Sequence, residues 1–342
     1  MAVSHPDFNA EATATEVASA FAGRIQGKNV VITGVGPSSL GEALALAIAS
    51  QQPANLILAS RTLSKVQEVA NKVKTLAPGT TVESVVLNLA SQKSVREAAS
   101  NVQGLIDHID ILINNAGMMV INRETTEEGI EIQFGTNHVG HFLFTNLLMT
   151  QLKNAAKVSE PGSTRVINVT SAGHRLSPIR FHDYNFEGKE VPQDERPPDG
   201  LPAMFNPTAA GYNGWLAYGQ SKAANILFTV YLNQHLASAG IVSYSVHPGS
   251  IWTGLSRSLD ETNSETMAKT SKSWKTADQG AATMLVAALD PGLNVVSDPT
   301  AVYLSDCQFA TAVPHAVSQD VAERLFRLSE DLVGMQFPLS VY

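Results

Sequence analysis

Short apolar runs alternate along the chain with longer stretches whose apolar residues recur at helical spacing. The short runs predict strands at residues 30–32, 56–59, 82–87, 109–113, 165–169, 242–246 and 301–304. The longer stretches predict helices at 40–52, 62–76, 91–104, 124–153, 216–239 and 276–289. This alternation predicts an α/β fold, a doubly wound parallel sheet of about seven strands with helices on both faces. Ligands of such sheets bind beyond the carboxyl ends of the strands.

We expect one folded domain over residues 27–342, preceded by an N-terminal helical extension over residues 1–26. Two stretches interrupt the alternation. Residues 188–214 contain several prolines, which cannot continue a helix or a central strand. Residues 253–275 are polar and rich in Ser and Thr. Both stretches are predicted to be loops, and loops of this length often cover ligand sites.

Composition narrows the class of protein. Of 342 residues, 23 are Lys or Arg and 31 are Asp or Glu, and the net charge of −8 argues against a nucleic-acid partner. Hydrophobic residues make up 44% and charged residues 16%, which excludes wholesale disorder. With Cys307 as the single cysteine, no intrachain disulfide can form, and the expected compartment is the cytoplasm. No apolar stretch approaches the roughly 18 to 20 residues of a membrane span, and residues 1–23 lack the basic residues of a signal peptide.

A turn rich in small residues follows the first predicted strand and leads into a predicted helix. It runs Thr33-Gly34-Val35-Gly36-Pro37-Ser38-Ser39-Leu40-Gly41. Such a turn lets backbone N–H groups and the helix N-terminus approach a pyrophosphate; the alternative is an ordinary tight turn. The residues predicted to bind a nucleotide here are Gly34, Ser39, Leu40 and Gly41.

The end of the second predicted strand indicates which dinucleotide binds. NAD-binding folds place an acidic residue about 20 residues past the last glycine, but here the chain has Ala59-Ser60-Arg61. The Ser60 hydroxyl and the Arg61 guanidinium suit a 2′-phosphate better, with Lys65 as a second cation one helical turn later. We therefore expect NADP(H) as the cofactor. The alternative is that Arg61 only begins the next helix, in contact with solvent.

Tyr218 and Lys222 are four residues apart in a predicted helix, so both project from one helix face. A phenol has a pKa of about 10, and a fixed ammonium nearby would lower it toward the range that acid–base chemistry requires. The pair alone is a weak signal, but other polar or small residues follow strands at the same predicted edge. They are Asn115, Ala116 and Gly117 after the fourth strand, Ser171 after the fifth, and Pro248, Gly249, Ile251 and Thr253 after the sixth, with Asn137 in the helix between the fourth and fifth.

Other candidate residues carry weaker signals. His138 and His141 lack a third ligand at suitable spacing, so no metal site is expected and packing is their predicted role. His174 is near enough to Ser171 in sequence to touch a substrate. Three tryptophans lie in or near the two irregular stretches, where they either pack in the core or form an apolar wall for the substrate. They are Trp215, Trp252 and Trp274.

From residue 27 to about residue 335, the chain resembles the short-chain dehydrogenase/reductase family. The resemblance rests on the ordered set Thr33-Gly34, Leu40-Gly41, Asn114-Asn115-Ala116-Gly117, Ser171, Tyr218-x-x-x-Lys222 and Pro248-Gly249. The segments around Asn137-His138, Ser221-Lys222 and His247-Pro248 are most similar to the branch that contains retinol dehydrogenases and WW-domain oxidoreductase, which many fungal reductases also resemble. The resemblance implies an NADP-binding Rossmann-type catalytic domain over residues 27–342, with 188–214 and 253–275 as its substrate loops.

The resemblance also implies a role for each matching residue. Tyr218 would donate the proton in carbonyl reduction and accept it in oxidation, and Lys222 would lower the pKa of Tyr218 and hold the nicotinamide ribose. Ser171 would bond to the carbonyl or alkoxide oxygen, and Asn137 would hold a water that links Lys222 to solvent. The other implied cofactor contacts are Asn115 beside the adenine ribose, Ile251 and Thr253 around the carboxamide and phosphates, and Asn88 on the adenine amine, where the family usually has Asp.

Besides Asn88, two further departures from the family pattern are visible. The glycine turn is one residue longer than usual and carries Ser38 and Ser39 where a middle glycine is common, which leaves its register on the pyrophosphate open. The gap between Ser171 and Tyr218 is also unusually long, and the proline-rich stretch within it is expected to shape substrate entry.

The sequence predicts an oxidoreductase that transfers hydride between NADPH and the carbonyl or alcohol of a fairly bulky, apolar small molecule, within a biosynthetic pathway of secondary metabolism. Two alternatives stay open. One is an isomerase or dehydratase that binds NADP without net redox change, and the other is a non-catalytic scaffold that senses NADP. The oligomeric state, a homodimer included, is also open.

Overall fold

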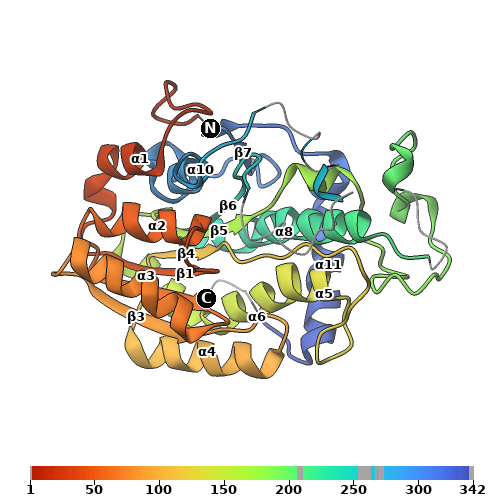
Figure 1. Cartoon of the computed structure of the whole chain (residues 1–342), viewed down its shortest axis with the longest axis horizontal. Coiled ribbons are helices and arrows are strands. Elements are labelled where there is room, and N and C mark those ends of the chain that lie inside the picture. Colours follow the sequence, from red (N-terminus) through yellow and green to blue (C-terminus); the bar gives the residue numbers. More distant parts are fainter. Residues whose placement is uncertain (1, 206–210, 253–262, 266–267, 269–272, 339–342) are drawn as a thin grey trace.

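The computed structural model describes residues 2–205, 211–252, 263–265, 268 and 273–338. The strands in these residues are β1 (Asn29–Thr33), β2 (Asn55–Ser60), β3 (Thr81–Val86), β4 (Ile111–Asn114), β5 (Thr164–Val169), β6 (Ile241–His247), β7 (Tyr303–Ser305) and β8 (Gln308–Phe309). They form one sheet in the order β3-β2-β1-β4-β5-β6-β7-β8. The first seven run parallel, and β8 lies antiparallel to β7. The predicted doubly wound α/β fold is confirmed (Figure 1).

Helices cover both faces of the sheet. The α-helices are α1 (Ala14–Ala20), α2 (Leu40–Ala49), α3 (Leu63–Leu76), α4 (Gln92–Leu105), α5 (Ile132–Phe134), α6 (Gly140–Leu147), α7 (Met149–Val158), α8 (Gly214–Leu236), α10 (Ala277–Leu289) and α11 (Gln319–Val333). The short 3₁₀ helices are Ala22–Arg24, Ala172–Arg175, Gln193–Glu195, Ala203–Phe205, Ala237–Ala239, Pro291–Leu293 and Pro314–Ala316. α2, α3 and α10 pack on one face of the sheet, and α4, α6 and α8 on the other (Figure 1). α1 lies against α2 and α10, and α11 lies against α8.

Which residues of a strand are buried follows from the helices that cover both faces of the sheet. A central strand that is buried on both faces has no polar side, so β1 is buried at each residue from Asn29 to Thr33. Within it, Val30 and Ile32 join the core on the α2 side, whereas Val31 joins the core on the α8 side. β3 is the edge strand next to β2, and its buried and exposed positions partly alternate.

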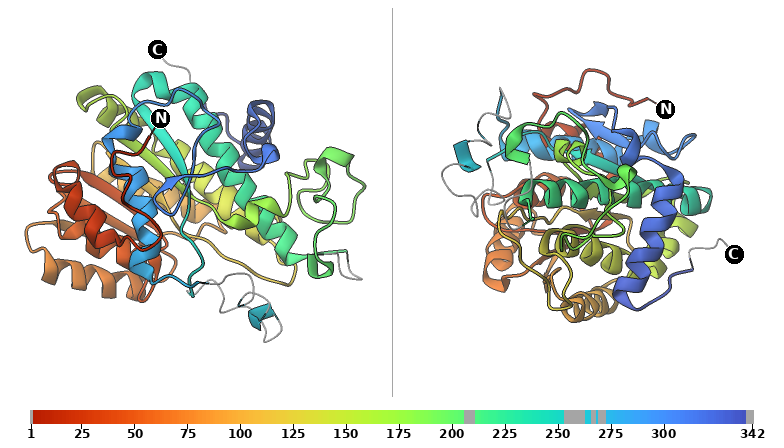
Figure 2. Two further views of the ribbon diagram at one scale, coloured as in Figure 1. Left: turned by 90° about the horizontal axis from the view of Figure 1, so that it is seen from above. Right: turned by 90° about the vertical axis from the view of Figure 1, so that its right-hand side faces the viewer.

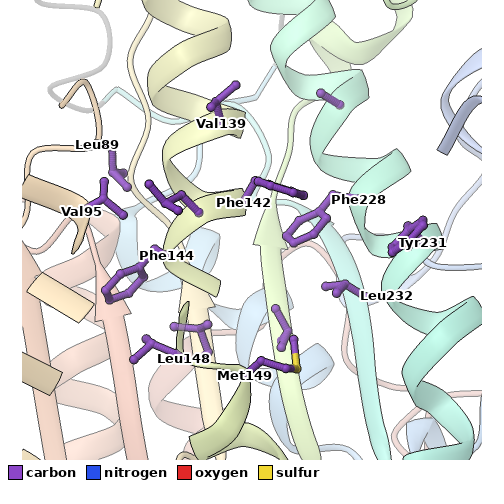
Figure 3. Close-up of a cluster of buried hydrophobic side chains, with 14 of the residues drawn as sticks. Leu89, Val95, Val139, Phe142, Phe144, Leu148, Met149, Phe228, Tyr231 and Leu232 are labelled. Carbon is purple, nitrogen blue, oxygen red and sulfur yellow. The ribbon is translucent and has the colours of Figure 1, made fainter. Parts of the chain in front are cut away.

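Phenylalanine side chains fill the space between α6 and α8 (Figure 3). The rings of Phe142 and Phe228 lie 5.5 Å apart. Phe326 of α11 stacks on Tyr231 of α8 at 3.7 Å, which joins the C-terminal helix to the same core. This packing fixes α8, the helix that carries Tyr218, against the sheet.

The predicted helix over residues 124–153 is wrong in its first turns. Thr125 pairs with Glu131 as an isolated bridge, so residues 124–131 form a closed turn. The Glu131 carboxylate accepts hydrogen bonds from the backbone N–H groups of Gln133 and Phe134 at 3.1 and 2.7 Å, and the helix begins only at Ile132. A side chain that caps a helix in this way competes with helical continuation of the chain before it. The helical segment is also interrupted by a π-helical turn, Gly135–Val139.

β8 is a further departure from the predicted elements. The strand predicted at residues 301–304 lies at Tyr303–Ser305 and returns through a tight turn to β8. Asp306 and Cys307 both have positive φ, at 52° and 64°. Turns of this hand usually contain glycine or asparagine, so the sequence gives little sign of this hairpin.

Residues 188–205 of the proline-rich stretch form an irregular excursion with short 3₁₀ helices, drawn in green at one side of the molecule in Figure 1 and in the left view of Figure 2. It is attached to the main body by Glu195, which is 2% exposed. The Glu195 carboxylate lies 2.8 Å from Nδ1 of His182 and 3.2 Å from the guanidinium of Arg324 on α11. Among the described residues no helix combines the length and apolar character needed to cross a membrane.

Candidate active site

A cavity of about 820 Å³ opens at the carboxyl edge of the sheet. Loops after β1, β2, β4, β5 and β6 line it, together with the first turns of α8. Most of the residues predicted for the site share this cavity: Gly34, Ser39, Leu40, Ser60, Arg61, Lys65, Asn115, Ala116, Gly117, Ser171, Tyr218, Lys222, Pro248, Gly249 and Ile251. Gly41, Asn88 and Asn137 do not line it, and Thr253 falls outside the described residues.

The glycine turn approaches the loop after β4 closely. Gly34 has a φ of +76°, and a Cβ atom there would lie 2.6 Å from the Cα of Ala116. At Gly41 a Cβ atom would lie 2.5 Å from the carbonyl oxygen of Gly34. Gly41 therefore does not line the cavity but lets α2 begin directly against the turn. A tight turn whose glycines allow close approach of the backbone is what a dinucleotide pyrophosphate requires, so the turn fits this group.

The longer turn is closed by Ser39, which was predicted to bind the nucleotide, and by Ser38 and Glu42, which were assigned no contact. The Ser39 hydroxyl caps α2, donating to the Gly36 carbonyl at 2.6 Å and accepting from the Glu42 N–H at 3.2 Å. Ser38 has a φ of +57°, in the left-handed region, and its N–H donates to the Glu42 carboxylate at 2.6 Å. That carboxylate also pairs with Lys72 at 2.7 Å. The signal that could have found Glu42 is the Ser-x-x-Glu spacing typical of a helix start.

Two cations lie where the adenosine end of a dinucleotide would be placed. Arg61 and Lys65 are exposed at the cavity wall beside Ser60, directly after β2. Neither forms an ion pair with any residue in the described part of the chain. The nearby carboxylate of Glu68 pairs instead with Lys72, at 3.3 Å. Two exposed cations at this point would suit an anionic group.

Asn88 takes a different position from the one expected. Its neighbours Leu87 and Leu89 line the cavity, but Asn88 does not. Its amide oxygen accepts a hydrogen bond from the Ala90 N–H at 3.2 Å, and its own N–H donates to the Ser94 hydroxyl at 3.0 Å. The side chain thus shapes the turn into α4, and its contact with adenine stays a prediction.

Asn137 is buried behind the cavity wall rather than in it. Its amide oxygen accepts from the Met118 N–H at 2.8 Å, and its amide nitrogen donates to the Met118 carbonyl at 3.0 Å and to the Ser221 hydroxyl at 2.9 Å. Both the oxygen and the nitrogen of the Asn137 amide are therefore engaged in hydrogen bonds within the protein. Asn137 therefore holds the cavity-lining loop after β4 against α8, and its predicted contact with a water stays a prediction.

Tyr218 and Lys222 lie together beneath Ser171, and burial governs their pKa values. Burial raises the pKa of Tyr218 to about 12, and a hydrogen bond with Ser171 acts in the opposite direction. Burial lowers the pKa of Lys222 to about 8. The expected lowering of the Tyr218 pKa by Lys222 is not observed. The Lys222 ammonium donates to the Val169 carbonyl at 3.2 Å and lies 5.5 Å from the centre of the Tyr218 ring, so desolvation of the phenol dominates.

The loop that presents Ser171 is fixed from behind. His174 is fully buried; its Nδ1 lies 2.7 Å from the Ser171 carbonyl, and its Nε2 accepts from the Val313 N–H at 3.3 Å. It does not line the cavity, so it positions Ser171 rather than touching a substrate. Thr170, which the sequence interpretation missed, donates to the Lys222 carbonyl at 2.7 Å and ties this loop to α8.

Aromatic side chains from both irregular stretches reach the cavity. Phe205, Trp215 and Trp274 line it. Trp252 stacks on Trp274 with ring centres 4.5 Å apart, and Trp215 meets the edge of Phe205 at 6.0 Å. The Trp215 indole N–H donates to Asn263 at 3.1 Å, which joins the start of α8 to the second irregular stretch. Of the two interpretations of the tryptophans, the wall of a substrate site fits Trp215 and Trp274.

The described residues contain no group of three or more His, Cys, Asp or Glu side chains arranged to hold a metal ion. His138 and His141 have other partners. Nε2 of His138 lies 2.8 Å from the Ser329 hydroxyl of α11, and Nε2 of His141 lies 2.8 Å from the Thr33 hydroxyl of β1. The two rings therefore face different parts of the fold.

Comparison with known proteins identifies the family. The family model for short chain dehydrogenase matches residues 28–185. Oxidoreductase fscI of Fusarium equiseti is 38% identical over 248 residues, 72% of this chain and 95% of that protein, and human retinol dehydrogenase 11 is 35% identical over 321 residues, 91% and 87%. The crystal structure of an uncharacterised Mycobacterium paratuberculosis protein aligns with a TM-score of 0.64 and 29% identity, covering 92% of this chain and 96% of that one. The chain therefore belongs to the short-chain dehydrogenase/reductase family of nicotinamide-dependent oxidoreductases and is retinol dehydrogenase-like.

Proposed function

We propose that this oxidoreductase is an NADP(H)-dependent carbonyl reductase or alcohol dehydrogenase acting on a bulky, apolar small molecule. The observation that carries the proposal is the convergence of Ser171, Tyr218 and Lys222 on the same cavity that Arg61 and Lys65 reach. Bound NADPH would supply the hydride, and the protein would supply the proton and hold the oxygen. A pathway of secondary metabolism, a cytoplasmic location and a homodimer belong to the same proposal.

The phenol of Tyr218 suits the role of proton donor. With its pKa raised to about 12, it is neutral across the physiological range and carries the proton that a developing alkoxide needs. The Ser171 hydroxyl, hydrogen-bonded to the same phenol, would bond to the substrate oxygen and hold it near that proton. The Lys222 ammonium, on the same helix face, would favour negative charge as it develops on the phenol.

A bulky, apolar substrate is supported by the shape and lining of the cavity. Met118, Met119 and Leu176 line the cavity, and Phe205, Trp215 and Trp274 form its aromatic wall. A cavity of about 820 Å³ holds a dinucleotide portion and still offers apolar surface around the reacting carbon. We expect long-chain or polycyclic carbonyl compounds to be better substrates than short polar ones.

Replacing Arg61 with Ala is expected to weaken NADPH binding roughly 10- to 100-fold, because a hydrogen bond to a charged group contributes about 1.5–3 kcal/mol. NADH lacks the 2′-phosphate, so its affinity should change little. Calorimetric titration of the purified protein with NADPH and with NADH measures both affinities. Lys74→Ala, which removes a cation from the last turn of α3 away from the cavity wall, is the control. A wild-type preference for NADH would contradict the assignment of Arg61.

The rate of carbonyl reduction is expected to fall as the pH rises through about 8, because Lys222 then loses its proton and the site loses its positive charge. Tyr218, with a pKa of about 12, stays neutral in this range and cannot cause the decline. The measurement is kcat against pH from 6 to 10 at saturating NADPH. Lys222→Arg keeps a charge at high pH, so any residual activity should show no decline near pH 8. A decline that persists unchanged in this variant would assign the titration to another group.

A further inference from the structure

A continuous series of hydrogen bonds connects the glycine turn with the catalytic helix, and His141 lies at its centre. The Thr33 hydroxyl accepts from the backbone N–H groups of Asn115 and Ala116, both at 3.0 Å. Its own proton is therefore free to point at Nε2 of His141, 2.8 Å away. On the other side of the ring, Nδ1 lies 3.0 Å from the backbone carbonyl of Asn137.

These partners determine which nitrogen of His141 carries the proton. The Asn137 carbonyl can only accept, so Nδ1 is the protonated nitrogen and Nε2 is the acceptor. The ring is 2% exposed. Burial lowers its pKa to about 4, so the imidazole is neutral and keeps one donor and one acceptor at neutral pH. A protonated His141 would carry an N–H at Nε2 as well as at Nδ1. The Thr33 hydroxyl could then no longer donate its proton to Nε2, so the imidazolium fits this pair of partners less well.

The series continues from Asn137 to the proton donor. The Asn137 amide donates to the Ser221 hydroxyl at 2.9 Å, and that hydroxyl donates to the Tyr218 carbonyl at 2.7 Å. The same amide fixes Met118 through both of its backbone groups. The bonds therefore link three parts of the cavity wall: the turn after β1, the loop after β4 and the first turns of α8.

His141 is suited to this connection by its place in the central helix. Asn137 lies within the π-helical turn Gly135–Val139, which ends two residues before His141, and its carbonyl lies 3.0 Å from Nδ1 of the His141 ring. The neighbouring His138 does not take part, since its Nε2 contacts Ser329 of α11. A histidine side chain reaches both Thr33 and Asn137, whereas an apolar side chain of equal size would leave the Thr33 hydroxyl and the carbonyl without these bonds.

We propose that His141 is a positioning residue that fixes the cofactor-binding turn relative to the helix bearing Tyr218 and Lys222. It acts through Thr33 on one side and Asn137 on the other, and it touches neither substrate nor cofactor. This proposal rests on the proposed reductase function. Its consequence is that loss of the ring changes the distance between the bound nicotinamide and the phenol, so that kcat falls more than substrate binding does.

The test uses three substitutions in the full chain. His141→Phe keeps the ring volume and removes both hydrogen bonds. His141→Asn places an amide donor near the former Nδ1 and can bond to the Asn137 carbonyl, and His141→Gln places an amide near the former Nε2 and can bond to Thr33. We expect kcat of His141→Phe to fall roughly 10- to 100-fold, as small misplacements of reacting groups do, with KM for the carbonyl little changed. Asn and Gln should each restore part of kcat.

A double-mutant cycle with Thr33→Val tests whether the bonds act as a series. If they do, the combined variant loses no more activity than the worse of the two single variants. Multiplying losses would instead mean that Thr33 and His141 act independently, and the proposal would be wrong. His138→Phe, three residues earlier in the same buried helical segment and outside the cavity, controls for general effects of losing a buried histidine.

The outcomes separate this proposal from the proposed function. If wild-type protein reduces no carbonyl compound, the proposed function fails, while NADPH titration of the same variants still reports whether His141 fixes the turn. A several-fold weaker NADPH affinity in His141→Phe would then support the connection, and an unchanged affinity would overturn it. If wild-type protein is active and folded His141→Phe keeps the wild-type kcat, the positioning role is excluded. Should His141→Phe not fold, the same criteria apply to the Asn and Gln variants.

Discussion

Tyr218→Phe is expected to lower kcat for carbonyl reduction by about 10²- to 10⁴-fold, the contribution typical of a positioned general acid. The substitution removes one hydroxyl from a nearly buried ring and keeps the packing of α8. Ser171 and Lys222 would remain in place, so the substrate oxygen would still be held but would have no proton donor. NADPH affinity should stay close to that of the wild type. The rate is measured with a bulky aldehyde or ketone as substrate, from the decrease in NADPH absorbance.

Tyr231→Phe is the matched control for this experiment. Tyr231 lies three turns later on α8, stacks on Phe326 and does not line the cavity. Its loss of a hydroxyl should leave kcat unchanged. Wild-type activity in Tyr218→Phe would contradict the proposed mechanism. If wild-type protein binds NADPH but oxidises none of it with any carbonyl compound, the proposed reductase function is wrong. The protein would then be a non-redox isomerase or dehydratase, or an NADP-sensing scaffold.

The fold and the position of the site were accessible from sequence because both depend on local pattern. The buried parallel strands β1 and β2 have continuous apolar runs at their centres, and each gives way to small or polar residues at its carboxyl end. The parallel arrangement then brings these ends to one edge, which is why Gly34, Asn115, Ser171 and Pro248 share a cavity although they are far apart in the chain. No long-range contact had to be known for this inference.

The parts that could not be predicted depend on pairs of distant residues. No local signal shows that the Asn137 amide forms hydrogen bonds with Met118 and Ser221. Nor does one show that the His174 ring accepts a hydrogen bond from Val313 and does not line the cavity. The helix start at Ile132 was missed because one carboxylate, Glu131, decides it. The raised pKa of Tyr218 likewise follows from burial in the folded chain, whereas the sequence shows only the nearby lysine.

Acidification is expected to destabilise the folded protein strongly below pH 6.5, because several histidines are buried in their neutral form. Burial lowers the pKa of His138 to about 3 and those of His141, His174 and His247 to about 4, from an ordinary value of 6.5. Below pH 6.5 the unfolded chain binds a proton at each of these rings and the folded chain does not. Stability is therefore complete above pH 6.5 and is lost as the pH falls toward 4.

The expected size of this effect is about 1.4 kcal/mol per pH unit for each histidine. His138 and His141 alone would lower the free energy of unfolding by about 5 kcal/mol between pH 6.5 and 4.5, comparable to the whole stability of many domains. Urea unfolding followed by circular dichroism at pH 7.5, 6.0 and 5.0 measures the slope. Tight binding of cofactor would raise stability at every pH, so the measurement is made without added nucleotide.

His138→Phe separates this cause from the titration of carboxylates. The His138 ring lies against Phe134, Phe142 and Phe228, and its Nε2 contacts the Ser329 hydroxyl. Its Nδ1 is buried and has no hydrogen-bond partner among the described residues. Phenylalanine suits this environment and binds no proton, so the pH dependence of unfolding between pH 6.5 and 5.0 should decrease by about 1.4 kcal/mol per pH unit. Phe142→Leu, which changes another ring of the same cluster and removes no titratable group, is the control and should keep the wild-type slope. An unchanged slope in His138→Phe would mean that His138 takes up its proton in the folded chain, and that the apolar cage admits charge which its burial should exclude.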